Sequence, residues 1–85
     1  MITVGELVNL TQNSYNVILT KGRKEVNYGE IEELNGLWDA TVSSFYGYYD
    51  DWTGFIKLDI YVDYDENKKV LKEYEEEIEE EIKWI

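Results

Sequence analysis

The sequence contains no cysteine, no histidine and no proline among its 85 residues. Without cysteine, the chain can form no disulfide, use no thiolate nucleophile and build no cysteine-based zinc site. Without histidine, it also lacks the usual general base and the commonest side-chain ligand of transition metals. No proline-rich linker and no repeat divides the chain. We therefore expect a single small domain, residues 1–85, whose fold depends on packing alone.

Long apolar runs are also missing. The N-terminal stretch MITVGELVNL has no basic start and no apolar run as long as that of a signal peptide. No segment approaches the ~20 apolar residues that cross a membrane. These absences predict a cytoplasmic protein without a membrane partner.

The common catalytic motifs are absent too. The sequence has no GxxxxGK[ST] phosphate loop, no GxSxG elbow and no EF-hand loop. Asp50 with Asp51, and Asp59 with Asp63, are paired carboxylates, but they fall in an expected turn and on an expected solvated strand face. Such settings lack the desolvation that tunes a carboxylate for acid–base chemistry. We predict that the protein is not an enzyme and uses no cofactor and no metal.

What the sequence has in excess is negative charge. Nineteen acidic residues stand against eight basic ones, which gives a net charge of −11. The resulting field disfavours direct binding to nucleic-acid phosphates or anionic membranes, and it attracts proteins that have basic surfaces. The alternative is that the charge only keeps the protein soluble.

The N-terminal half predicts a helix followed by a hairpin. Thr3 and Glu6 stand at the spacing of a capping box, which predicts a short helix that ends between Leu10 and Asn13. The alternating segments 14–20 and 24–28, on either side of a turn at 21–23, predict two paired strands. One or two helical turns are expected at 30–35.

The second half predicts two more strands. Residues 40–49 are rich in β-branched and aromatic side chains, and residues 55–64 alternate strictly. One face of the segment 55–64 carries the apolar residues Ile56, Leu58, Ile60 and Val62. The other face carries Lys57, Asp59, Tyr61 and Asp63. A sheet with one face packed on the core and the other exposed to solvent is typical of antiparallel pairing. We therefore expect an α+β fold: a four-stranded antiparallel sheet with a short N-terminal helix and a long acidic C-terminal helix on one face.

The expected C-terminal helix is capped at Asp65 or Asn67 and runs almost to Ile85. Asp65, Glu66 and Lys83 follow the preference of the helix dipole, but its other lysines lie early and its other glutamates late, against that preference. Neighbouring carboxylates on a helix lie ~5–6 Å apart, so they could imitate the phosphates of a nucleic acid. The alternative is a plain solvated face, since glutamate is a good helix former. The candidate binding residues on this helix are Glu73, Glu75, Glu76, Glu79 and Glu80.

The segment 45–52 is unusually aromatic. On strand geometry, Tyr46 and Tyr48 point to one face and Phe45 and Tyr49 to the other, so part of this cluster should be exposed. Tyrosine-rich surfaces of this kind are typical of binding sites, although half-buried tyrosines can also serve sheet stability alone. The candidate binding residues here are Tyr46, Tyr48, Tyr49, Asp50, Asp51, Trp52 and Tyr61.

Thr3-Val4-Gly5-Glu6-Leu7 and the strand Ile60-Tyr61-Val62 resemble segments of short proteins carried by phages and mobile elements of Gram-positive bacteria. In size, acidity and lack of catalytic residues the chain is also similar to anti-CRISPR proteins and other phage inhibitors, several of which imitate DNA. The resemblance implies an inhibitor or regulator in the bacterial host cell. Its partner would be a larger protein, such as a CRISPR effector or another host DNA enzyme, whose basic nucleic-acid site it blocks. The alternative is a small accessory or assembly protein that acts through an exposed aromatic face or as a homodimer.

Overall fold

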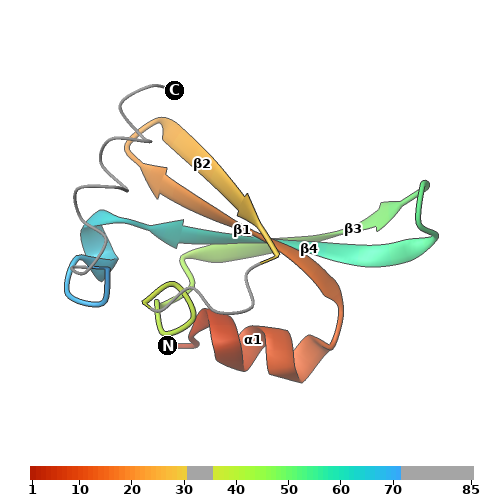
Figure 1. Cartoon of the computed structure of the whole chain (residues 1–85), viewed down its shortest axis with the longest axis horizontal. Coiled ribbons are helices and arrows are strands. Elements are labelled where there is room, and N and C mark those ends of the chain that lie inside the picture. The colour runs from red at the N-terminus through yellow and green to blue at the C-terminus, as the bar shows by residue number, and fades with distance from the viewer. Residues whose placement is uncertain (31–35, 72–85) are drawn as a thin grey trace.

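The computed structural model describes residues 1–30 and 36–71. These ranges contain α1 (Val4–Thr11), β1 (Ser14–Lys21), β2 (Lys24–Gly29), β3 (Ser44–Asp50), β4 (Phe55–Asp63) and the 3-10 helix η1 (Asp65–Asn67). The class is α+β, as expected. Figure 1 shows α1 on one side of the sheet and the β3–β4 hairpin extending past it to the right. None of the helices in these ranges is long and apolar enough to cross a membrane.

Helix α1 begins and ends where the sequence predicts. The Thr3 hydroxyl accepts a hydrogen bond from the Glu6 amide, and the Glu6 carboxylate accepts one from the Thr3 amide, both at 3.2 Å. The helix ends at Gln12, whose φ of 53° is left-handed. Gly5 lets the helix lie directly against Trp38, because a Cβ at residue 5 would come within 2.5 Å of the indole nitrogen.

The four strands form one sheet in the order β2-β1-β4-β3. The pairs β1–β2 and β3–β4 are antiparallel, but the central pair β1–β4 is parallel, from Ser14 opposite Lys57 to Thr20 opposite Asp63. The sheet is therefore mixed, and the prediction of an antiparallel sheet is wrong at this pair. The alternation of apolar and polar residues shows which face of a strand is buried. It does not show whether the strand runs parallel or antiparallel to its neighbour. The long connection over residues 30–43 gives the chain the length that a parallel arrangement needs.

The third strand is shorter than predicted, because it begins at Ser44 and not at Ala40. Residues 40–42 instead bond to the N-terminal segment: the Val4 amide donates to the Ala40 carbonyl, and the Val42 amide donates to the Ile2 carbonyl, both at 2.9 Å. Residues 31–35 of the predicted helical turns and most of the predicted C-terminal helix lie outside the described residues. Where that helix is expected to begin, the described residues form the 3-10 helix Asp65–Asn67 and then turns over 68–71, so the prediction of an α-helix is wrong there.

The core lies between α1 and one face of the sheet. Its buried members are Val4, Leu7, Val17, Leu19, Leu37, Ala40, Leu58, Ile60, Val62, Tyr64 and Leu71. Three of the four apolar residues predicted to share a face of β4 belong to this core. The fourth, Ile56, is 54% exposed. The core therefore includes β4 from Leu58 to Val62 but not the first residues of the strand.

Asn67 is the buried polar residue of the core, with only 2% of its surface exposed. Its side-chain oxygen accepts a hydrogen bond from the Thr41 amide at 2.8 Å. Its side-chain nitrogen donates to the carbonyls of Thr41 at 3.2 Å and of Asp63 at 2.8 Å. Asn67 thus ties the end of β4 to the segment that leads into β3.

We predict that Asn67→Ala lowers the free energy of unfolding by about 2–3 kcal/mol, because it leaves backbone groups of Thr41 and Asp63 without partners in a buried setting. Urea unfolding followed by circular dichroism measures this. Asn9→Ala, at an exposed position of α1, is the control and should change stability by less than about 0.5 kcal/mol. Equal stability of the two variants would show that these bonds contribute nothing net.

Candidate protein interface

Most of the exposed large apolar side chains in the described ranges lie on the β3–β4 hairpin. They are Phe45 (55% exposed), Tyr46 (64%), Tyr49 (64%), Trp52 (96%), Phe55 (66%) and Ile56 (54%). We call these six residues the aromatic patch. Elsewhere in the described ranges only Met1 and Leu10 are comparably exposed. Exposed apolar clusters of this kind mark interaction sites.

The patch is exposed because nothing in the described ranges is long enough to cover it. Helix α1 has eight residues and is about 12 Å long. Strand β4 has nine residues and is about 30 Å long. Strand β1 also begins at Ser14, opposite Lys57, so Phe55 and Ile56 extend beyond its start. The end of the hairpin therefore projects past the core (Figure 1).

Tyrosines line the face of the hairpin that points away from the core. Tyr46 lies opposite Asp59 and Tyr48 opposite Lys57, which places both tyrosines on the polar face of β4, together with Tyr61. The rings of Tyr46 and Tyr48 stack, with centroids 6.3 Å apart and planes 17° apart. The two rings thus hold each other in place, and Tyr46 stays accessible to solvent.

The other face of the hairpin carries Phe45, Tyr49 and Ile56. Tyr49 lies directly opposite Ile56 in the register. Gly47 separates Phe45 from Tyr49, and a Cβ there would contact the Leu58 side chain at 3.4 Å. Both faces of the hairpin therefore carry aromatic side chains, which agrees with the arrangement that the sequence predicts for residues 45–49.

Asp50 orders the tip of the hairpin. Its carboxylate accepts hydrogen bonds from the Trp52 amide at 3.0 Å and from the Thr53 hydroxyl at 3.1 Å. The Lys57 ammonium pairs with the same carboxylate at 3.2 Å, and the Gly54 amide donates to the Asp50 carbonyl at 2.8 Å. The loop that presents the exposed indole of Trp52 is therefore held by its own hydrogen bonds.

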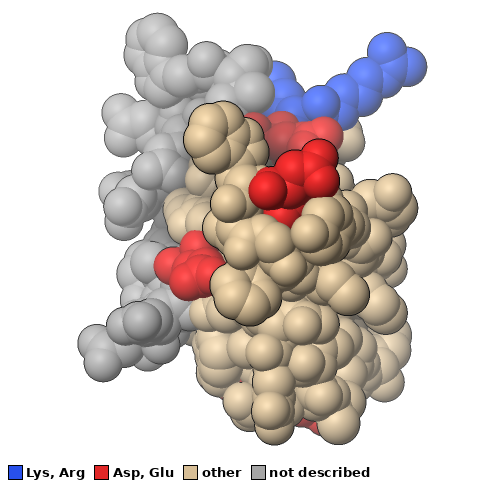
Figure 2. Space-filling view, turned by 90° about the vertical axis from the view of Figure 1, so that its right-hand side faces the viewer, with Lys and Arg blue, Asp and Glu red and all other residues tan. Residues whose placement is uncertain are grey.

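The hairpin end carries little charge. No charged residue occurs from Ala40 to Tyr49, and Figure 2, which faces this end of the molecule, shows mostly uncharged surface with acidic groups in a few places. The described residues hold ten acidic and six basic side chains, whereas residues 31–35 and 72–85 hold nine acidic and two basic ones. The described surface is thus far less acidic than the chain as a whole.

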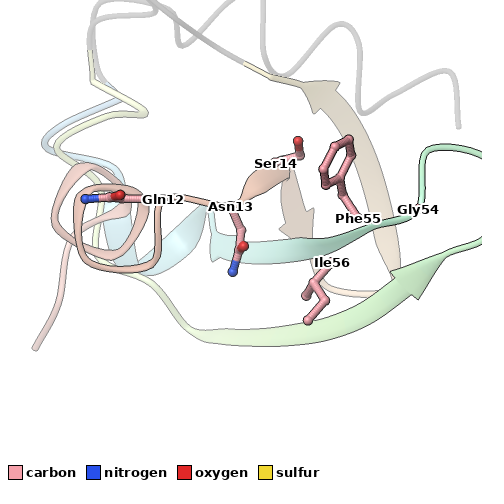
Figure 3. Close-up of a pocket in the computed structure, with 6 residues that line it drawn as sticks. All are labelled: Gln12, Asn13, Ser14, Gly54, Phe55 and Ile56. Atoms are coloured by element: carbon pink, nitrogen blue, oxygen red, sulfur yellow. The ribbon is translucent and has the colours of Figure 1, made fainter.

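An open pocket of about 450 Å³ lies beside the patch, where the end of α1 meets the start of β4. Its lining residues are Gln12, Asn13, Ser14, Gly54, Phe55 and Ile56. Figure 3 shows the Phe55 ring and the Ile56 side chain pointing to opposite sides of the strand. The lining has no charged group and combines the polar side chains of Gln12, Asn13 and Ser14 with the apolar ones of Phe55 and Ile56.

The structure gathers six of the predicted binding residues on the hairpin: Tyr46, Tyr48, Tyr49, Asp50, Asp51 and Trp52. Tyr61 lies on the same outer face as Tyr46, further along β4. The predicted acidic residues Glu73, Glu75, Glu76, Glu79 and Glu80 lie outside the described residues. Sequence reasoning did not name Phe45, Phe55 or Ile56 as binding residues, and it placed Ile56 on the apolar face of its strand. The length of β4 relative to the short N-terminal helix was the pattern that could have revealed them.

The chain matches no protein-family model, no curated protein and no solved structure. The resemblance to phage inhibitors and anti-CRISPR proteins therefore stays a prediction. Within residues 1–30 and 36–71, no three acidic side chains gather into a group that could hold a metal ion. Function has to be inferred from the aromatic patch and from the distribution of charge.

The pKa of Asp50 lies below its ordinary value of 3.8, chiefly because the Trp52 amide donates to the carboxylate; partial burial opposes this, and Lys57 and Thr53 add to the lowering. Because this pKa is lowered in the folded protein, the ionised Asp50 carboxylate stabilises the folded loop at pH values above the ordinary pKa. This support is lost as the pH falls through the folded-state pKa.

We predict that the NMR shift of the Trp52 amide titrates with a midpoint below 3.8, and that Asp50→Asn removes this transition. A midpoint at or above 3.8 would contradict the hydrogen bonding described here.

Proposed function

We propose that this protein is a non-catalytic binding module that docks its aromatic patch against another protein. The observation that carries this proposal is the exposure of six large apolar side chains on one hairpin whose first strand is almost uncharged. Tyrosine and tryptophan give large contact areas at a low cost in side-chain entropy. They are also the residues that most often dominate the energy of protein interfaces.

The energetics favour Trp52 and Tyr49 as anchors. Their exposed fractions are 96% and 64%, and an aromatic side chain buries about 150–250 Å² when it is fully covered. At about 25 cal/mol per Å², covering Trp52 contributes roughly 4–6 kcal/mol before the costs of association. The bonds made by Asp50 reduce those costs, because the loop is ordered before the partner arrives.

We predict that Trp52→Ala and Tyr49→Ala each weaken partner binding about 10- to 100-fold, as expected for anchor residues. The full chain serves as bait in bacterial lysate, and the affinity of each variant for the purified captured protein is then measured. Leu10→Ala is the matched control, because Leu10 is 76% exposed on α1, away from the hairpin. Thermal unfolding confirms that the variants are folded. Full affinity after both hairpin changes would overturn the aromatic patch as the binding surface.

The charge distribution favours a second candidate function, acidic mimicry of nucleic acid. Seven glutamates lie between residues 73 and 81, a stretch without a basic residue. On this proposal, the protein is an inhibitor or regulator of phage or mobile-element origin. It blocks the basic nucleic-acid site of a host defence or DNA enzyme, such as a CRISPR effector, and the aromatic patch supplies the apolar anchors.

We predict for this second candidate that replacing Glu75, Glu76, Glu79 and Glu80 by Gln weakens binding at least about tenfold. We also predict that raised salt and excess duplex DNA displace the natural chain. The control replaces two exposed acids of the described surface, Glu25 and Glu66, by Gln. Mimicry would be ruled out if the affinity for the partner were unchanged by raised salt, by competitor DNA and by the four Glu→Gln substitutions. The aromatic patch would then remain as the interface.

A further inference from the structure

Strand β3 has a free outer edge within the sheet that the structure describes. The strand order β2-β1-β4-β3 places β3 last, so no other described strand pairs with its outer side. The residues just before it are already paired, since Thr41 bridges to Thr3 and the Val42 amide donates to the Ile2 carbonyl. The free edge is therefore the seven residues Ser44–Asp50. Unpaired amides and carbonyls along such an edge are a template for another strand.

This edge lacks the features that usually block strand addition. Proteins protect their edges with lysine, proline, inward-pointing charges or very short strands. Strand β3 contains no lysine and no proline. Its one charged residue, Asp50, stands at its end and is paired with Lys57 at 3.2 Å.

The free edge is symmetric about its midpoint, Gly47. Reading outwards from Gly47, Tyr46 matches Tyr48, and Phe45 matches Tyr49. If the whole edge pairs antiparallel with a copy of itself, Gly47 therefore falls opposite Gly47. Every aromatic residue then falls opposite another aromatic residue, and aromatic pairs across strands are stabilising.

We infer that β3 pairs with β3 of a second copy of this chain, joining two four-stranded sheets into one eight-stranded sheet about a two-fold axis at Gly47. The inference rests on the proposed function, since it names a second copy as a protein that the aromatic patch binds. The axis is perpendicular to the sheet, so the core faces of the two copies lie on the same side. Phe45 then meets the second copy's Tyr49, as the isologous contact of a two-fold dimer requires.

The edge itself presents almost no charge to a second copy, even though the chain as a whole is acidic. An acidic protein can pair with itself only where the contact brings no acids together. From Ser44 to Tyr49 the edge is uncharged, and the register places Asp50 opposite the second copy's Ser44 and not opposite another acid. Three side chains of β3 are more than half exposed in each copy. The buried area is then on the order of 1,000 Å², at the lower end for specific interfaces. The dimer should form at micromolar concentrations and above.

Sedimentation of the full chain between about 5 µM and about 500 µM tests the pairing. The expected result is a rise in mass from one chain towards two. Phe45→Lys should weaken this self-association at least about tenfold, because lysine on an edge strand blocks pairing. Leu10→Lys is the matched control, with the same side chain introduced at an exposed apolar site of α1, and it should still dimerise. A chain that stays monomeric throughout overturns the inference.

Single cysteines test the register, because the natural chain contains none. Across the two-fold axis, the Cα atoms at position 47 would lie about 4.5–5.5 Å apart, within the reach of a disulfide. Gly47→Cys should therefore cross-link under mild oxidation. In Phe45→Cys the two sulfurs would be separated by four residues, about 13 Å along the strand, and should not cross-link. Equal cross-linking of the two variants overturns the register. A monomeric chain that still captures a foreign protein through Trp52 overturns the self-pairing but not the proposed binding module.

Discussion

The parallel pairing of β1 with β4 determines how the rest of the structure is arranged. It joins two hairpins side by side, and its register starts only at Ser14 opposite Lys57. The core therefore forms around Leu58, Ile60 and Val62, where β4 has a neighbour on both edges and α1 beneath it. The first residues of β4 lie beyond that support. The same pairing that buries the second half of the strand thus exposes its beginning, together with the part of β3 that faces it.

The exposed hairpin is stabilised by polar bonds where apolar burial is missing. Its tip depends on the Asp50 carboxylate, which bonds to Trp52, Thr53 and Lys57. Its outer face depends on stacking between Tyr46 and Tyr48. These interactions keep the aromatic side chains in a defined arrangement without covering them. A surface prepared in this way loses little conformational entropy when a partner binds, which is why a small patch can serve as an interface.

The sequence predicted each local element of the described part more accurately than their assembly. The capping box at Thr3 and the turn at Gly22 depend on neighbouring residues, and both are where local patterns place them. The direction of β4 relative to β1 depends on a connection of many residues, which alternation does not report. Ile56 was assigned to the core because alternation shows which side a residue faces, but not whether another element covers that side. The tyrosines and Trp52 were recognised as surface candidates because a small sheet can bury only one face.

The two kinds of surface in this chain respond to salt in opposite ways, and this separates their roles. Pairing through the uncharged β3 edge is opposed by the mutual repulsion of two chains that each carry a net charge of −11. Dissolved ions screen that repulsion, so salt strengthens association through the edge. Contact between the glutamates of residues 73–81 and a basic protein is an attraction, and the same ions weaken it. On these proposals, low salt opposes self-pairing through the edge, because the net charges repel each other, and favours binding of a basic partner. Competition between a second copy and a foreign partner would then be decided by ionic strength as well as by the shape of the aromatic patch.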